Sequence, residues 1–210
     1  MIHSMQMKNL ATNHMYNAEI SAGSLMLRES RKVAGLLLDK ADDMAWHHAL
    51  SVDNILQKKV PATARRMAKL IRNRLELMTP ESWEMVIHGN SEVAMQSLLA
   101  AAIKHSRLLG DFLNEVVKDH YKVFNKQLTV MDWKNFLAAC AQRDGAVASW
   151  SDTTRAKLGQ VVLRILTEAK YVDSTRSLKL TPVSLAPEVR KYLASNKETY
   201  VLRCMDVAHE

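Results

Sequence analysis

The sequence predicts an all-α protein, a mainly helical bundle that ends in a small C-terminal β-hairpin. Hydrophobic residues make up 48% of 210 positions, which is enough to build a sizeable core. Only 6 glycines and 4 prolines occur, and apolar residues recur at three- and four-residue spacing over most of the chain. The exception is the segment 171–180, where two short apolar runs flank the polar residues 173–177, a pattern typical of a hairpin.

The amino-terminal half predicts a series of short and medium helices. Residues 24–40 show helical spacing, and Asp42 or Asp43 is expected to cap a short helix that carries Trp46. Pro61 suits the first turn of a helix that runs to about Met78. Its expected buried face consists of Ala64, Met67, Ala68, Ile71, Leu75 and Met78.

The centre of the chain predicts a short helix from Pro80 and then a long apolar helix from Glu92. We expect Gly110 to kink or divide the long helix, because glycine weakens helix interiors. Asp111, Glu115 and Asp119 recur every four residues among lysines, which favours a charged, solvated helix face over a metal or acid–base site.

The carboxyl-terminal part predicts a helix from about Asp132 to Asp144 and a last long helix capped by Ser151 or Asp152. A helix followed by a basic hairpin is the order found in winged-helix modules, so we expect this part to be winged-helix-like. We therefore divide the chain into a poorly ordered extension (1–15), a helical part with a basic helix (16–130), a C-terminal helical or winged-helix-like part (131–195) and a tail (196–210).

Charge is concentrated in one segment. Residues 54–75 contain seven basic residues and no acidic one, so this segment carries +7, which equals the net charge of the whole chain. On a helical wheel Arg65, Lys69 and Arg72 share one face, with Arg66 and Asn73 beside them. Lys58 and Lys59 precede the helix and extend this basic ridge. Such a ridge predicts contacts to phosphates, with salt-dependent affinity.

A second basic face is expected on the last long helix, away from its apolar side. Lys157, Gln160 and Arg164 form it, and Arg176 in the expected hairpin extends it. Glutamine and arginine can read base edges, but they serve the phosphate backbone equally well. Glu168 on the same face dilutes the positive charge.

Several classes of function find no support in the sequence. No nucleophile–base pair, phosphate-binding loop or clustered metal ligands occur, so we expect no enzyme, no cofactor and no metal site, and we interpret His47 and His48 as ordinary helix residues. Cys140 and Cys204 lie far apart, and no apolar run reaches bilayer length. These features indicate a protein of the cytoplasm with no membrane association.

Several short runs, taken in order, carry a family resemblance. The runs are 16–20 (YNAEI), 27–30 (LRES), 55–58 (ILQK), 63–66 (TARR), 71–75 (IRNRL), 150–151 (WS) and 157–158 (KL). With these runs the chain resembles the BrxA family, small helical components of BREX (bacteriophage exclusion) phage-defence systems, from about Tyr16 to Leu193.

The resemblance implies a non-enzymatic accessory protein, similar in fold to the RNA-binding antitermination protein NusB, that binds DNA beside other BREX proteins. The duplex is the expected substrate, and RNA stays open as the alternative. A protein–protein adaptor, whose basic ridge docks an acidic BREX partner, also stays open. The resemblance brings no residue-level site, so the candidate residues come from the helical wheel alone.

Overall fold

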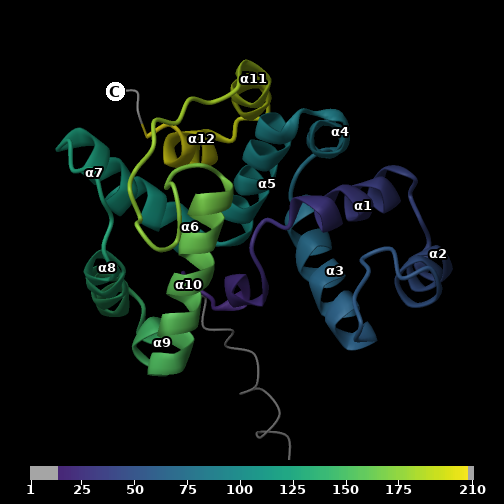
Figure 1. The fold of residues 1–210 in the computed structure, drawn as a ribbon, viewed down its shortest axis with the longest axis horizontal. Coiled ribbons are helices and arrows are strands. Elements are labelled where there is room, and N and C mark those ends of the chain that lie inside the picture. Colours follow the sequence, from purple (N-terminus) through teal and green to yellow (C-terminus); the bar gives the residue numbers. More distant parts are fainter. Residues whose placement is uncertain (1–13, 208–210) are drawn as a thin grey trace, which may run out of the picture.

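All of the regular secondary structure in residues 14–207, the part of the chain that the computed structural model describes, is helical (Figure 1). The predicted all-α class is therefore confirmed. The helices of the amino-terminal half are η1 (Glu19–Ala22), α1 (Leu27–Leu38), α2 (Asp43–His47), η2 (His48–Val52), α3 (Pro61–Leu75), α4 (Pro80–His88) and α5 (Ser91–His105). Those that follow are α6 (Arg107–Asp111), η3 (Phe112–Val117), α7 (Lys118–Lys122), α8 (Val130–Arg143), α9 (Gly145–Ala148), α10 (Asp152–Glu168), α11 (Pro187–Ser195) and α12 (Thr199–Met205).

Side-chain caps fix where several helices begin. The side chain of Asp42 accepts a hydrogen bond from the backbone of Ala45 at 2.8 Å, and that of Ser151 accepts one from Thr154 at 3.2 Å. Both caps were expected from the sequence, because these side chains satisfy backbone N–H groups that have no partner within the helix. Thr129 and Asp132 form a reciprocal capping box at the start of α8.

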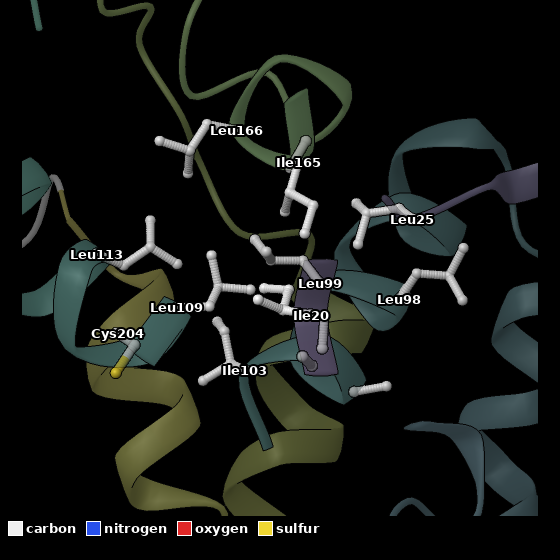
Figure 2. Close-up of a cluster of buried hydrophobic side chains, with 14 of the residues drawn as sticks. Ile20, Leu25, Leu98, Leu99, Ile103, Leu109, Leu113, Ile165, Leu166 and Cys204 are labelled. Carbon is white, nitrogen blue, oxygen red and sulfur yellow. The ribbon is translucent and has the colours of Figure 1, made fainter. Parts of the chain in front are cut away.

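Helix α5 lies at the centre of the fold, and residues 93–94 and 96–103 within it are buried. Its apolar side chains are distributed around the whole helix, as expected for a helix covered on every side. Figure 2 shows Leu98, Leu99 and Ile103 of α5 directed toward side chains from the other helices. The core thus joins the amino-terminal helices to α10 and α12.

The long central helix is divided at Ser106, not at Gly110. Ser106 has extended backbone angles (φ −128°, ψ 101°), whereas Gly110 lies inside α6. A Cβ atom on Gly110 would lie 2.3 Å from the hydroxyl oxygen of Tyr200. Glycine is therefore needed here for close packing against α12, and the prediction of a kink at this residue was wrong.

Asp111 also departs from the prediction, because it is 3% exposed. Its carboxylate accepts hydrogen bonds from the hydroxyls of Tyr16 at 2.9 Å and Tyr200 at 2.8 Å, and from Arg107 at 2.9 Å. The arginine neutralises the buried charge, as burial of a carboxylate requires. Asp111 is therefore a packed structural residue and not part of a solvated face.

The expected C-terminal β-hairpin is wrong, because residues 171–180 form no strands. A single antiparallel bridge joins Val172 to Leu180, and another joins Gln127 to Lys179. Two features interrupt the ladder: Leu178 has a positive φ of 54°, and the carboxylate of Asp173 accepts hydrogen bonds from the backbone of Ser174 and Lys179. The segment also pairs its backbone with residues 126–128, through bonds from Leu128 to Leu178 and from Leu180 to Lys126.

The winged-helix interpretation required a pair of strands as the wing. Residues 14–207 contain no such pair, so the structure does not support it. Two further helices, α11 and α12, follow this segment, and α12 lies in the stretch 196–210 that the sequence suggested as a tail. Val201, Cys204 and Met205 of α12 are buried. The domain boundaries at 130 and 195 stay predictions, and the expected extension 1–15 lies mostly outside the described residues.

None of the helices between residues 14 and 207 combines the length and the apolar character that crossing a bilayer requires.

Candidate nucleic-acid interface

Helix α3 separates an apolar face from a basic one. Ala64, Ala68, Ile71 and Leu75 are buried, as the helical wheel predicted. Pro61 occupies the first turn, where its missing N–H leaves no intrahelical bond unmade. The opposite face carries exposed polar and basic side chains, namely those of Arg65, Arg66, Lys69 and Asn73, and Lys59 is exposed just before the helix.

Not every cation of the basic segment is free. Lys58 is half-buried, and its Nζ lies 2.7 Å from Oε1 of Glu29. Burial opposes ionisation of Glu29, but hydrogen bonds from Lys58 and the backbone, together with the charges of Lys58 and Arg28, outweigh it and lower the carboxyl pKa. The Nε atom of Arg72 donates to Glu76 at 2.7 Å, and its guanidinium carbon lies 4.7 Å from the ring centroid of Trp46. Lys58 and Arg72 were predicted to contact phosphates. In the structure both already interact with side chains of the protein.

Arg74, the last basic residue of the segment, is 4% exposed and serves the fold. Its two terminal nitrogens donate to the carbonyl oxygens of Ser24 at 2.6 Å and Gly23 at 2.9 Å. Glu168 of α10 binds the same segment of the backbone. Its carboxylate accepts hydrogen bonds from the Ser24 hydroxyl and the Leu25 amide, at 2.7 Å each. Burial lowers the pKa of Arg74 to about 10, and the charge of Glu168 opposes that shift.

We call this arrangement of Arg74, Glu168 and residues 23–25 the clamp. It ties the carboxyl end of α3 to the carboxyl end of α10, and η1 packs against both helices below it (Figure 1). The clamp also changes the interpretation of Glu168. Because both carboxylate oxygens are held by residues 24 and 25, this side chain does not lie free beside the basic face of α10.

The second predicted face is present on α10. Leu158, Val162, Ile165 and Leu166 are buried, and Lys157, Gln160 and Arg164 are exposed. Arg176 is also exposed, but it lies in the irregular turn after α10. The side chain of Gln127 donates to the carbonyl of Ser177 at 2.7 Å, so this turn is held beside the α7–α8 connection.

Two basic residues beside the ridge were missed by the sequence reasoning. Arg28 and Lys32, both exposed on α1, line an open depression of about 250 Å³ together with Glu29 and residues 55–58. Lys32 donates to the carbonyl of Ile55. Their spacing of four residues on one helix was the available signal. The net charge of −1 over residues 1–53 concealed it.

The described residues contain no group of three or more histidine, cysteine or acidic side chains arranged to hold a metal ion. Cys140 and Cys204 are free and buried. Burial raises the pKa of both thiols, to about 11 for Cys204. Both groups are therefore protonated and unreactive at neutral pH.

Comparison with known proteins identifies the family. The BrxA family model matches residues 14–197. The chain belongs to the BrxA family. It is 46% identical over 193 residues to the BREX protein BrxA of Paramagnetospirillum magneticum, covering 92% of this chain and 97% of that protein. The BREX protein BrxA of Escherichia coli O9:H4 is 37% identical over 175 residues, covering 83% of this chain and 82% of that protein.

The fold is shared with a solved structure. A crystal structure of an uncharacterised protein from Magnetospirillum magneticum matches with a TM-score of 0.86 and 44% identity, covering 92% of this chain and 99% of the other. The predicted resemblance to the BrxA family of BREX phage-defence systems is thus confirmed.

Proposed function

We propose that this BrxA-family chain is a non-enzymatic, cytoplasmic DNA-binding accessory protein of a BREX phage-defence system, which contacts the phosphate backbone through the basic faces of α3 and α10. The observation that carries the proposal is the ridge on α3. Lys59, Arg65, Arg66 and Lys69 are exposed, and the segment 54–75 contains no acidic residue. Cations fixed on a rigid helix favour a polyanion, because each phosphate neutralised releases counterions.

The ion pairs within the protein set the expected strength of this contact. Of the seven cations in the segment, Lys58, Arg72 and Arg74 already bind protein groups. The other four have no ion-pair partner between residues 14 and 207, and four phosphate contacts predict a slope of about −3.6 for the logarithm of the binding constant against the logarithm of salt concentration. Engagement of Lys157 and Arg164 as well predicts about −5.4. Seven contacts would give about −6.3.

A titration of the purified protein with duplex DNA, single-stranded DNA and RNA across a salt series tests the proposal. We expect the duplex to bind, with a slope between about −3.6 and −5.4, and to be recovered unmodified. A flat salt response, or no binding at low salt, would overturn the proposal. Stronger binding to RNA than to duplex would favour a NusB-like RNA-binding role, the alternative that shares the same electrostatics.

A further inference from the structure

A second surface, distant in sequence from the basic ridge, carries exposed apolar side chains that folding does not explain. Val123 (64% exposed) and Phe124 (87% exposed) follow α7, and Val130 (60%) and Met131 (57%) form the first turn of α8. We call these four residues the α7–α8 apex. The helices concerned lie at the edge of the molecule opposite α2 and α3 (Figure 1). Four exposed apolar side chains within residues 123–131 differ from the isolated ones that are normal on a surface, and such groups are typical of interaction sites.

The backbone conformation at Phe124 gives no folding reason for an aromatic side chain at this position. Its φ is +56°, in the left-handed region. Its amide donates to the carbonyl of Tyr121, and the amide of Asn125 donates to the carbonyl of His120. This is the pattern of a helix end that normally has glycine at the left-handed position. A bulky aromatic residue there costs conformational free energy and, at 87% exposure, recovers little through packing.

A contact between the side chains of His120 and Asp132 joins the two sides of the apex. Nε2 of His120 on α7 lies 3.4 Å from Oδ1 of Asp132 on α8. The other oxygen of Asp132 accepts from the amide of Thr129 at 2.6 Å. Both carboxylate oxygens of Asp132 therefore have partners within the protein. Lys126 and Lys134, by contrast, are exposed beside the apex, and no ion pair within the described residues involves them.

We propose that the α7–α8 apex docks a partner protein whose binding groove is apolar and bordered by carboxylates, and that Phe124 is the side chain that fills the groove. The apolar residues supply the area removed from water, and the two lysines supply charge complementarity at the rim. A second copy of this chain fits poorly, because a symmetric contact would bring lysines against lysines. The exterior of a duplex offers phosphates and no apolar groove for four such side chains.

The test compares the parent protein with Phe124→Gly, using each of the other purified proteins of the same BREX system as immobilised probes. We expect one of them to bind the parent and to bind Phe124→Gly at least tenfold more weakly. Because glycine is favoured at a positive φ, the variant is expected to be at least as stable as the parent. Phe124→Asn, also tolerated in this conformation, provides a second variant. Met44→Ala, which removes another exposed apolar side chain (82%) on α2, is the matched control and should bind normally.

Charge reversal at the rim gives an independent measurement. Lys126→Glu with Lys134→Glu should weaken the same complex and remove most of its salt dependence. Duplex DNA binding should be unchanged in Phe124→Gly, so this proposal and the DNA-binding proposal fail separately. The docking proposal is overturned if no BREX protein binds the parent or if Phe124→Gly binds as the parent does. It is equally overturned if Phe124 is needed for self-association, for binding to phosphatidylserine vesicles or for duplex binding and not for a protein partner.

Discussion

Helices α3 and α10 are similar in length, but they offer different amounts of free charge to a ligand. Each has a buried apolar face and an exposed face with basic residues. Helix α3 exposes Arg65, Arg66 and Lys69, whereas α10 exposes Lys157 and Arg164 around an uncharged glutamine. At their carboxyl ends both helices turn a charged side chain inward, Arg74 from one and Glu168 from the other, and the two charges hold the same backbone.

This comparison shows that the role of a charged residue depends on its position along the helix. Some charged side chains stabilise the fold, and others stay exposed for binding. In the middle of each helix the basic side chains lie on the exposed face and remain available. The final turn meets the core, where a charge is retained only if hydrogen bonds satisfy it. We expect α3 to supply most of the affinity for a polyanion and α10 to contribute fewer but more selective contacts.

The largest effect is expected from reversing charge on α3. Arg65→Glu with Lys69→Glu should abolish duplex binding at about 0.15 M salt, because two attractive contacts become repulsive. The thermal midpoint should change little, since both side chains are exposed. Titration of labelled duplex and a thermal melt provide the two measurements.

A core variant on the same helix is the control for this experiment. Ile71→Ala removes a side chain that is 2% exposed and should destabilise the fold by about 2–5 kcal/mol. If the double charge reversal unfolded the protein as Ile71→Ala does, the ridge would be structural and α3 would not be the main binding surface.

The clamp predicts a large effect on stability from an arginine that resembles its neighbours in sequence. Arg74→Ala removes two charge-assisted hydrogen bonds and leaves Glu168 without its nearby cation, so we expect a loss of about 3 kcal/mol in unfolding free energy. Arg65→Ala on the same helix should change it by less than about 0.5 kcal/mol. Urea unfolding measures both. Equal stabilities would show that the clamp contributes nothing beyond ordinary surface contacts.

Much of this fold follows from the sequence because its signals are local. The apolar spacing of α3 and α10 and the caps at Asp42 and Ser151 act within one helical turn, and each was predicted correctly. The errors concern contacts over long distances in sequence. Gly110 is required by Tyr200, and Asp111 is neutralised by Arg107 while it binds Tyr16. No periodicity within one segment reports such contacts.

The candidate interface shows the same limit. A helical wheel correctly placed Arg65, Arg66 and Lys69 on an exposed face. It gave no information on Lys58, whose partner Glu29 belongs to another helix. The expected hairpin failed because Leu178 adopts a left-handed conformation and its neighbours pair with residues 126–128, which a pattern of apolar residues does not encode.

A smaller effect, different in kind, is expected on α10. Gln160→Ala and Arg164→Ala should change discrimination between duplex sequences by about 1–3 kcal/mol if either side chain reads a base edge. Arg66→Ala on α3 should weaken all sequences about equally, because phosphates carry no sequence information. Competition against a panel of duplexes separates the two. If the α10 variants bind every duplex as the parent does, this face is ordinary surface, and DNA binding belongs to α3 alone.

The smallest effect concerns pH and tests how closely the end of α3 is coupled to the core. Burial lowers the pKa of His105, the positive charge of Arg74 lowers it further, and Glu19 opposes both. Nε2 of His105 lies 3.2 Å from Oε2 of Glu19, and its Nδ1 is buried without a partner among the described residues. The ring therefore loses its proton more readily in the folded protein than in the unfolded chain. Protonation would place a buried N–H beside Arg74 with no acceptor.

The sign of the pH dependence follows from this lowered pKa. Below a pH of about 6.5 the unfolded chain binds a proton that the folded protein does not, so the unfolding free energy falls as the pH drops from about 7 toward the folded pKa. His105→Gln keeps a donor near Glu19 but cannot titrate, and it should flatten the curve of thermal midpoint against pH in this range. Glu19→Gln removes the group that favours protonation, and it should steepen the curve. Subtracting the parent curve cancels the contribution of the other histidines. Identical curves for the parent and His105→Gln would mean that His105 is solvated and that Arg74 exerts no influence on it.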